Sequence, residues 1–266
     1  DFDNDKAVAS WDDLEPIDKY MLAKTYALLR ECEQSYDAYK FQGVYRSCYD
    51  FVNELSSVYM DVAKDRLYSE ASDSPRRRAV QTVLMNILEV LVRVLAPILS
   101  FTCDEVWEHF PPAMRAAEDR PTNVQLAGWP TRDDFVPALP EDDGKADLDK
   151  FAVAMDARDV VTKALEQARA DGLVKKSQEA RVVVSAPAEA LAALDGFGAD
   201  VLEELFIVSG VEITEGEELA CEVLAAEGEK CPRCWNYRVL GGNSNHPAVC
   251  ERCGDALDAI GFEEAE

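Results

Sequence analysis

Two Cys-x-x-Cys pairs, Cys231-Pro232-Arg233-Cys234 and Cys250-Glu251-Arg252-Cys253, are separated by fifteen residues in the last part of the sequence. Each pair can direct two thiolates from one tight turn, and the intervening loop can bring the pairs together around one ion. The spacing therefore predicts a zinc site with four ligands, Cys231, Cys234, Cys250 and Cys253. Two disulfides or four unrelated thiols are the alternatives that remain open from the pattern.

This predicted metal site has the composition of a structural site. Four cysteines fill the coordination sphere, whereas a catalytic zinc keeps one position open for water. His246 precedes Cys250 by four residues and could replace one thiolate. Gly254 is expected to take a left-handed turn conformation after the second pair. Because the segment is too short to bury a core of its own, we expect the metal to hold its fold.

The composition of the whole chain indicates globular structure. A length of 266 residues allows two or three compact units, and a hydrophobic share of 48% is ordinary for folded protein. No apolar run reaches membrane-spanning length. The start, Asp1-Phe2-Asp3, resembles no signal peptide and lacks Met, so the chain is expected to begin inside a longer protein. The four other cysteines are scattered among apolar residues, which favours a reducing cytoplasm.

The charge is strongly negative overall but uneven along the chain. A net charge of −25 argues against broad, non-specific binding to nucleic acid. Residues 227–254 nevertheless hold four basic and three acidic side chains, and residues 64–93 hold six basic and four acidic ones. Charge alone does not separate a binding surface from chance clustering on solvated faces.

The first part of the chain predicts a helical bundle, from the apolar stripes of four successive helices. These are expected at residues 12–38, at about 44–69, from Ser74-Pro75 to Pro97, and after a capping box at Thr102-Cys103-Asp104-Glu105. Pro111-Pro112 should end the fourth. The stripes are read as core, so residues 1–115 form the predicted bundle domain.

A change of composition follows the bundle. Four prolines and an acidic run predict a connector at residues 116–146, anchored by Trp129. Residues 147–226 predict a small α+β domain: a helix ending at Gly172, a strand at 180–185, a helix interrupted by Gly196 and Gly198, and β segments at 205–208, 211–213 and 219–225. Residues 227–266 form the zinc module. The predicted fold class is mainly α.

Motifs of catalysis are missing from this sequence. There is no phosphate-binding Gly-rich loop, and His109 and His246 are the only histidines. His109 is interpreted as a partly exposed structural imidazole. The residues therefore predict a non-catalytic assembly, and the patterns alone do not say what it binds.

Several stretches together resemble one family. Lys64-Asp65-Arg66-Leu67-Tyr68, Leu95-Ala96-Pro97-Ile98-Leu99-Ser100-Phe101-Thr102 and Glu105-Val106-Trp107 are similar to the anticodon-binding helical domain of bacterial isoleucyl-tRNA synthetases. Leu205-Phe206-Ile207-Val208-Ser209 resembles the domain that follows it, and residues 227–235 resemble the C-terminal zinc module of the same enzymes. The resemblance covers nearly the whole chain, in family order.

The resemblance implies a class I aminoacyl-tRNA synthetase, which activates isoleucine with ATP and Mg²⁺ and attaches it to tRNA(Ile). The His-x-Gly-His and Lys-Met-Ser-Lys-Ser signatures of its catalytic core do not occur here. The chain thus resembles only the C-terminal part, which grips the anticodon stem and loop. The implied partners are tRNA(Ile) and the catalytic domain of the same polypeptide. The implied protein is a cytoplasmic monomer without membrane contact; it holds one structural zinc, and this segment alone is non-catalytic.

The same resemblance places the zinc module at the anticodon end of the tRNA. Trp235 directly follows a zinc ligand and is predicted to stack on an anticodon-loop base. Arg233, between two ligands, is predicted to point outward and to touch the loop as well, and Arg238 adds charge nearby. An indole packed inward is the alternative. Weaker candidates for phosphate contacts are Lys64, Arg66, Arg76, Arg77 and Arg78. The doublet Lys175-Lys176 departs from the small-residue turn expected in the family.

Two rival interpretations come from other classes of protein. A DNA-repair glycosylase carries a similar zinc finger, but it starts with a catalytic Pro-Glu and lacks so large a helical part. The other rival is a protein-interaction scaffold with a zinc ribbon and no RNA binding. A tRNA-binding assay separates this scaffold from the predicted function.

Overall fold

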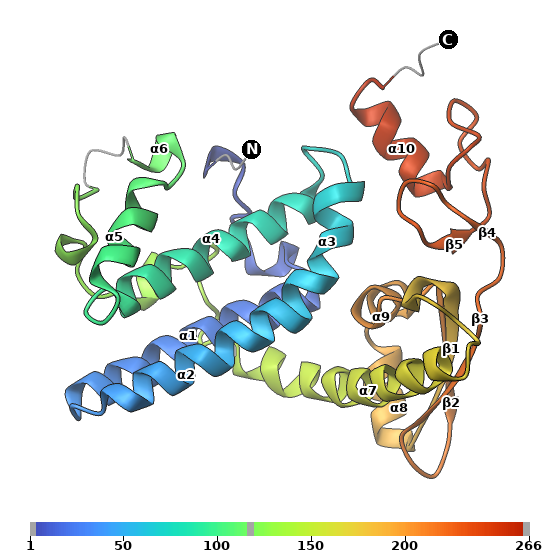
Figure 1. Cartoon of the computed structure of the whole chain (residues 1–266), viewed down its shortest axis with the longest axis horizontal. Helices are drawn as coiled ribbons and strands as arrows, with labels where there is room; N and C mark the ends of the chain where they lie inside the picture. The colour runs from blue at the N-terminus through green and yellow to red at the C-terminus, as the bar shows by residue number, and fades with distance from the viewer. Residues whose placement is uncertain (1–3, 116–119, 263–266) are drawn as a thin grey trace. The chain divides into compact units, whose positions relative to one another are not determined.

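The computed structural model describes residues 4–115 and 120–262 and is mainly helical, as the fold-class prediction required. The chain divides into two compact units, whose elements are drawn in Figure 1. The first contains Asp1–Asp61 and Pro75–Leu148, and the second contains Val62–Ser74 and Asp149–Glu266. Within the described residues, no helix is long and apolar enough to cross a membrane. The four-part division predicted above remains a prediction.

The first unit is built from the predicted amphipathic helices. The helices are α1 (Pro16–Asp37), α2 (Phe41–Glu54), α4 (Pro75–Leu95), α5 (Ser100–Glu108) and α6 (Pro112–Arg115). Five π-helical residues, η3 (Leu55–Tyr59), join α2 to α3 (Met60–Ser69) without a break, so one prediction for 44–69 covers three elements. Short 3-10 turns lie at Asn4–Lys6, Trp11–Asp13, Val124–Leu126 and Arg132–Asp134.

The core of this unit lies around α1, which packs against both α2 and α4 (Figure 1). The apolar stripes supply its fully buried side chains, among them Met21, Leu22, Val44, Val83 and Ile87. Buried polar contacts occur within it: the Tyr59 hydroxyl donates to Asp18 Oδ1 at 2.7 Å. A second apolar cluster forms around Trp107 and Phe110 on and after α5. The stripes are therefore core, as predicted.

Side chains of α4 hold the segment that follows the bundle through hydrogen bonds to its backbone. Asn86 accepts from the Val136 backbone N–H at 2.9 Å and donates to the Val136 carbonyl. Arg93 donates to the carbonyls of Gly128 and Trp129. The Trp129 ring meets Tyr36 edge-on, with 5.5 Å between centroids. The anchoring role predicted for Trp129 is confirmed.

The capping box predicted at Thr102 is wrong. α5 begins at Ser100, two residues earlier, and its N-cap Leu99 makes no side-chain cap. The chain turns sharply after α4 because the Leu95 carbonyl accepts from the N–H groups of both Ile98 and Leu99. Thr102 is consequently inside the first turn. Pro112 opens the short α6, where a missing N–H is harmless.

The second unit contains most of α7 (Lys145–Ala170), followed by a small α+β fold. Its elements are β1 (Ala180–Ala186), α8 (Ala188–Asp195), α9 (Ala199–Phe206), β2 (Gly210–Glu215) and β3 (Ala220–Ala225). The sheet order is β2-β1-β3, with β1 parallel to β2 and antiparallel to β3. Alternate residues of β1 are buried, and α8 and α9 connect β1 to its parallel partner (Figure 1).

The strand predicted at residues 205–208 is wrong. Leu205 and Phe206 form the end of α9, and Ile207 ends the helix in a left-handed conformation at φ +59°. Leu202, Leu205 and Phe206 are buried at the three- and four-residue steps of a helix face. A short apolar run is ambiguous between strand and buried helix, and here the helix buries it. The break predicted at Gly196 and Gly198 is confirmed by the gap between α8 and α9.

Candidate metal centre and nucleic-acid interface

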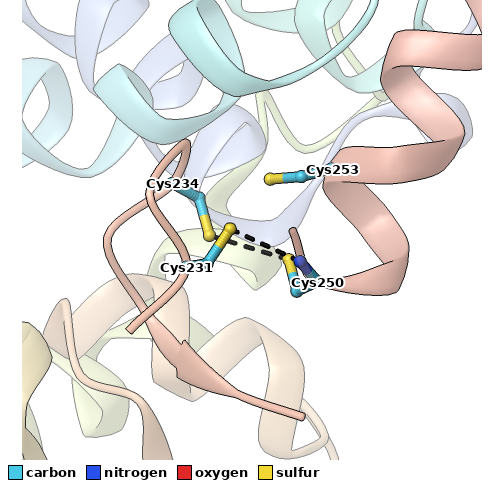
Figure 2. A group of neighbouring side chains, drawn as sticks. All are labelled: Cys231, Cys234, Cys250 and Cys253. Atoms are coloured by element: carbon cyan, nitrogen blue, oxygen red, sulfur yellow. Dashed lines mark hydrogen bonds between the residues drawn. The ribbon is translucent and has the colours of Figure 1, made fainter. Parts of the chain in front are cut away.

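The two cysteine pairs lie on different elements that converge in the second unit (Figure 2). The first pair lies in the turn between β4 (Glu229–Lys230) and β5 (Tyr237–Arg238), which pair as a hairpin. Within the turn, the Trp235 N–H donates to the Cys231 carbonyl at 2.9 Å. Cys250 is the N-cap of α10 (Glu251–Ala259), and Cys253 lies in its first turn.

The distances between the sulfurs fit a tetrahedral zinc site. All four Sγ atoms lie within 4.8 Å of one another, and those of Cys234 and Cys250 are 3.8 Å apart. Four thiolates at about 2.3 Å from one zinc ion stand about 3.8 Å from each other. Three of the cysteines are buried and Cys234 is half-buried. Zinc bound here would have a closed coordination shell and no position for water.

The surroundings of the cluster favour thiolate at Cys234. Hydrogen bonding from the Cys253 thiol is the largest influence, and it lowers the pKa of Cys234 to about 4 together with the Asn236 backbone N–H and Arg252. Burial opposes this shift. Thiolate is the form that ligates zinc. Burial raises the pKa of Cys250, and the hydrogen bond to Cys234 raises that of Cys253, so these two thiols would give up their protons when a metal ion binds.

His246 and Gly254 take roles other than those considered from the sequence. His246 lies outside the described cysteine cluster, with its Nε2 3.4 Å from Asp258 Oδ1. Gly254 is helical, within α10, so the left-handed turn predicted for it is wrong. A Cβ on Gly254 would lie 2.5 Å from Asn243 Cβ, so close packing of the loop explains this glycine. Trp235, which is not a glycine, has a left-handed backbone conformation at φ +67°.

The indole of Trp235 faces solvent. Its side chain is 53% exposed, so the inward-packed alternative does not describe this structure. Lys176 Nζ lies 5.0 Å from the ring centroid and Lys230 Nζ lies 5.8 Å from it. Both distances are within the range of cation–π attraction. An exposed aromatic ring with two ammonium groups is a chemically suitable surface for a base and its phosphates.

Arginines around the cluster contact protein groups of the same unit. Arg233 Nη1 donates to the Ser69 carbonyl at the end of α3. Arg252, on α10, forms a two-point ion pair with Asp65, which lies on α3 like Ser69. Arg238 donates to the Ser209 carbonyl at 2.8 Å and to Glu203 at 2.5 Å. These guanidinium groups hold the cysteine module against α3 and α9.

The remaining predicted RNA contacts are divided between the two units. In the second unit, Lys64 is exposed, whereas Arg66 is fully buried with its Nε 2.6 Å from Glu204 Oε1. In the first unit, Arg76 pairs with Glu15 at 2.9 Å, Arg77 is half-buried, and Arg78 is 8% exposed and donates to Gln81. Burial and internal pairing give Arg66 and Arg78 structural roles in the described protein.

Two residues that sequence reasoning did not nominate, Lys176 and Lys230, lie beside Trp235. The Lys175-Lys176 doublet was a visible departure from the family pattern, but the sequence did not show which aromatic ring it approaches. Glu179 orders this loop by accepting from the Lys175 N–H at 2.7 Å. That bond, with a second from the Lys176 N–H, lowers the pKa of Glu179.

Comparison with known families identifies the larger part of the chain. The family described as the anticodon-binding domain of tRNA ligase matches residues 18–184. This chain belongs to that anticodon-binding family. The match begins in α1 and ends in β1, so it spans the helical unit and enters the small sheet. A second family, the zinc finger found in FPG and IleRS, matches residues 228–256 and contains all four cysteines.

Three relatives of this anticodon-binding chain carry the same name. Isoleucine–tRNA ligases of Geobacillus kaustophilus and Natranaerobius thermophilus are 40% and 36% identical to it, each over 97% of the chain. That of Symbiobacterium thermophilum is 35% identical over its full length. The resemblance to isoleucyl-tRNA synthetases is therefore confirmed. The chain spans 28–29% of the length of these three relatives.

Proposed function

We propose that this chain is the part of an isoleucine–tRNA ligase that binds the anticodon stem and loop of tRNA(Ile). The observation that carries the proposal is the family match over residues 18–184, followed in the chain by a cysteine module that exposes Trp235. The relatives named isoleucine–tRNA ligase support the choice of tRNA. A cytoplasmic, monomeric protein is part of the proposal.

Attachment of isoleucine, with ATP and Mg²⁺, belongs in this proposal to the longer ligase and its catalytic domain. The segment described here supplies RNA binding to that reaction. We expect it to be inactive alone, because the sequence has none of the ATP-site signatures of the family. Isoleucine-dependent ATP–pyrophosphate exchange above background by the purified chain would contradict this expectation.

We propose further that Cys231, Cys234, Cys250 and Cys253 hold one structural zinc ion. The sulfur distances and the zinc-finger family match support this assignment. Zinc would supply cross-linking of the β4–β5 turn to α10, since the module buries only a small apolar cluster with Val249, Leu240 and Leu257. The module would in this way hold the backbone of Trp235.

Trp235 is the proposed base-stacking residue, and the exposed Lys64 is a proposed phosphate contact. Arg233, Arg238, Arg76 and Arg77 stay candidates whose guanidinium groups would exchange a protein partner for a phosphate. Arg66 and Arg78 are the weakest candidates, since burial removes them from an RNA surface.

An anticodon stem-loop RNA of tRNA(Ile) and a blunt RNA duplex with the same number of phosphates provide the test. We expect fluorescence anisotropy to show tighter binding of the zinc-loaded chain to the stem-loop, because the stem-loop offers unpaired bases to stack and the blunt duplex offers none. Equal affinity for both RNAs would overturn the proposal. Binding of neither RNA would favour the scaffold alternative.

A further inference from the structure

We propose that Lys176 and Lys230 form, with Trp235, a single nucleotide-binding site in which the ring stacks on an unpaired base and the two ammonium groups bind the flanking phosphates. This inference rests on the proposed RNA function and deepens it. It names two residues that have no role in the zinc cluster and that come from separate segments of the second unit, before η6 (Ser177–Glu179) and in β4.

The geometry around the ring carries the argument. Lys176 and Lys230 are exposed lysines, yet both place Nζ within 6 Å of the Trp235 centroid, at 5.0 and 5.8 Å. Trp235 remains 53% exposed although these two lysines lie next to its ring. The site thus combines an open aromatic surface with two cations that are not buried. Single-strand RNA sites combine the same two components.

The backbone holds the three side chains in position. Trp235 is fixed at φ +67° by the cysteine turn, in which its N–H donates to the Cys231 carbonyl. Lys230 directly precedes Cys231 and pairs with Tyr237 in the β4–β5 hairpin. The loop of Lys176 is tied down through the Glu179 carboxylate, which accepts from the Lys175 N–H at 2.7 Å. The backbone segments that carry the ring and the cations are therefore ordered before any RNA arrives.

Nearby arginines are less available for the same task. Arg233, Arg238 and Arg252 already donate to Ser69, Glu203 and Asp65. Lysine contacts with an exposed ring are weak by comparison with a base–aromatic stack, so a base can displace an ammonium from the ring face. The displaced ammonium then lies beside the phosphate of the stacked nucleotide. Charge and stacking would act together at one position of the loop.

The experiment compares Lys176→Gln and Lys230→Gln with the unchanged chain and with Lys163→Gln, an exposed lysine on α7 that serves as the matched control. Anisotropy titrations use the tRNA(Ile) anticodon stem-loop at salt concentrations from 50 to 200 mM. Loss of one single-strand phosphate contact should reduce the log–log salt slope by about 0.7. The fourfold rise in salt should then weaken each site variant about 2.6-fold less than it weakens the control.

A second RNA, a blunt duplex with the same number of phosphates, separates stacking from plain charge. We expect the two lysine variants to change its slope by less than they change that of the stem-loop. Unchanged slopes with normal stem-loop affinity would overturn this inference and leave the proposed function standing. Failure of the unchanged, zinc-loaded chain to bind the stem-loop would instead overturn the proposed function.

Discussion

At the scale of the residue, Trp235 combines features that rarely coincide. It is a bulky residue at φ +67°, where an L side chain is strained, and it is 53% exposed. Neither packing nor backbone preference explains an indole at this position. The RNA contact proposed above would make use of both features, since base–aromatic stacking needs an exposed ring.

Trp235→Ala should weaken binding of the anticodon stem-loop by about 1–3 kcal/mol, the usual contribution of one base stack. Trp235→Phe keeps a ring and should lose less. Anisotropy titration measures both variants, and zinc content must match the unchanged chain. Full affinity in zinc-loaded Trp235→Ala would show that the RNA contact lies elsewhere.

Trp235→Gly should lose RNA binding as the alanine variant does while gaining stability of the module. Glycine relieves a left-handed strain of about 1–2 kcal/mol. The measurement is the urea concentration at which each variant, glycine or alanine, releases its zinc to a coloured chelator. A glycine variant that releases zinc at lower urea than the alanine variant would contradict the strain argument.

Two adjacent acids on α9 give a matched test of burial. Glu204 pairs with Arg66, whose side chain is fully buried, while Glu203 pairs with Arg238, whose side chain is 38% exposed. Glu204→Gln should cost more, about 3 kcal/mol of unfolding free energy, because it removes a charged partner from a fully buried guanidinium group. Glu203→Gln should cost at most about 1 kcal/mol. Equal losses in urea titrations would refute the distinction.

At the scale of the element, the loop before β1 depends on one carboxylate. The Lys175 backbone N–H, with that of Lys176, holds the pKa of Glu179 below its ordinary value. A depressed folded pKa adds stability above the unfolded pKa and loses it as pH falls through the folded value. Glu179→Gln should therefore melt lower than the unchanged chain at pH 7.

The difference between these two melting temperatures should shrink as pH falls below about 4, the ordinary range of a glutamate. Thermal melts followed by circular dichroism at pH 7 and pH 3.5 measure it. A difference that persists undiminished at pH 3.5 would mean that the Glu179 charge does not hold the loop.

Helices could be predicted where an apolar stripe of helical periodicity is bounded by residues that start or stop helices, such as Ser, Pro and Gly. The stripe after Ser74-Pro75 predicted α4, and Gly196 with Gly198 predicted the break between α8 and α9. Errors arose where local pattern competes with tertiary structure. Residues 205–208 carry the apolar run of a strand yet complete a buried helix face, and the turn around the Leu95 carbonyl starts α5 before Thr102.

The candidate site shows the same limit. Cysteine spacing predicted the four-sulfur cluster because ligand geometry is local to each pair. The environment of Arg66 and the approach of Lys176 to Trp235 depend on residues far apart in the sequence. Spacing and charge counts carry no information about such long-range contacts, so a buried arginine and an exposed one look alike in sequence.

At the scale of the whole molecule, the two units should respond differently to loss of metal. The first unit has its own apolar core around α1, α2 and α4. The cysteine module buries only a small cluster, which consists mainly of its four cysteines. Chelation of zinc should increase proteolysis within residues 227–262 and leave the first unit resistant. Mass spectrometry of the fragments checks this; elemental analysis that finds no zinc in reduced protein would contradict it.

The central claim is that this chain grips the anticodon end of tRNA(Ile), and nuclease footprinting of the full tRNA tests it most directly. With zinc-loaded chain in excess, we predict protection of the anticodon loop and its stem, and ordinary cleavage of the acceptor stem. Trp235→Ala should restore cleavage at one loop position before the others. Protection confined to the acceptor stem, or no protection at protein concentrations that bind the tRNA, would contradict the account.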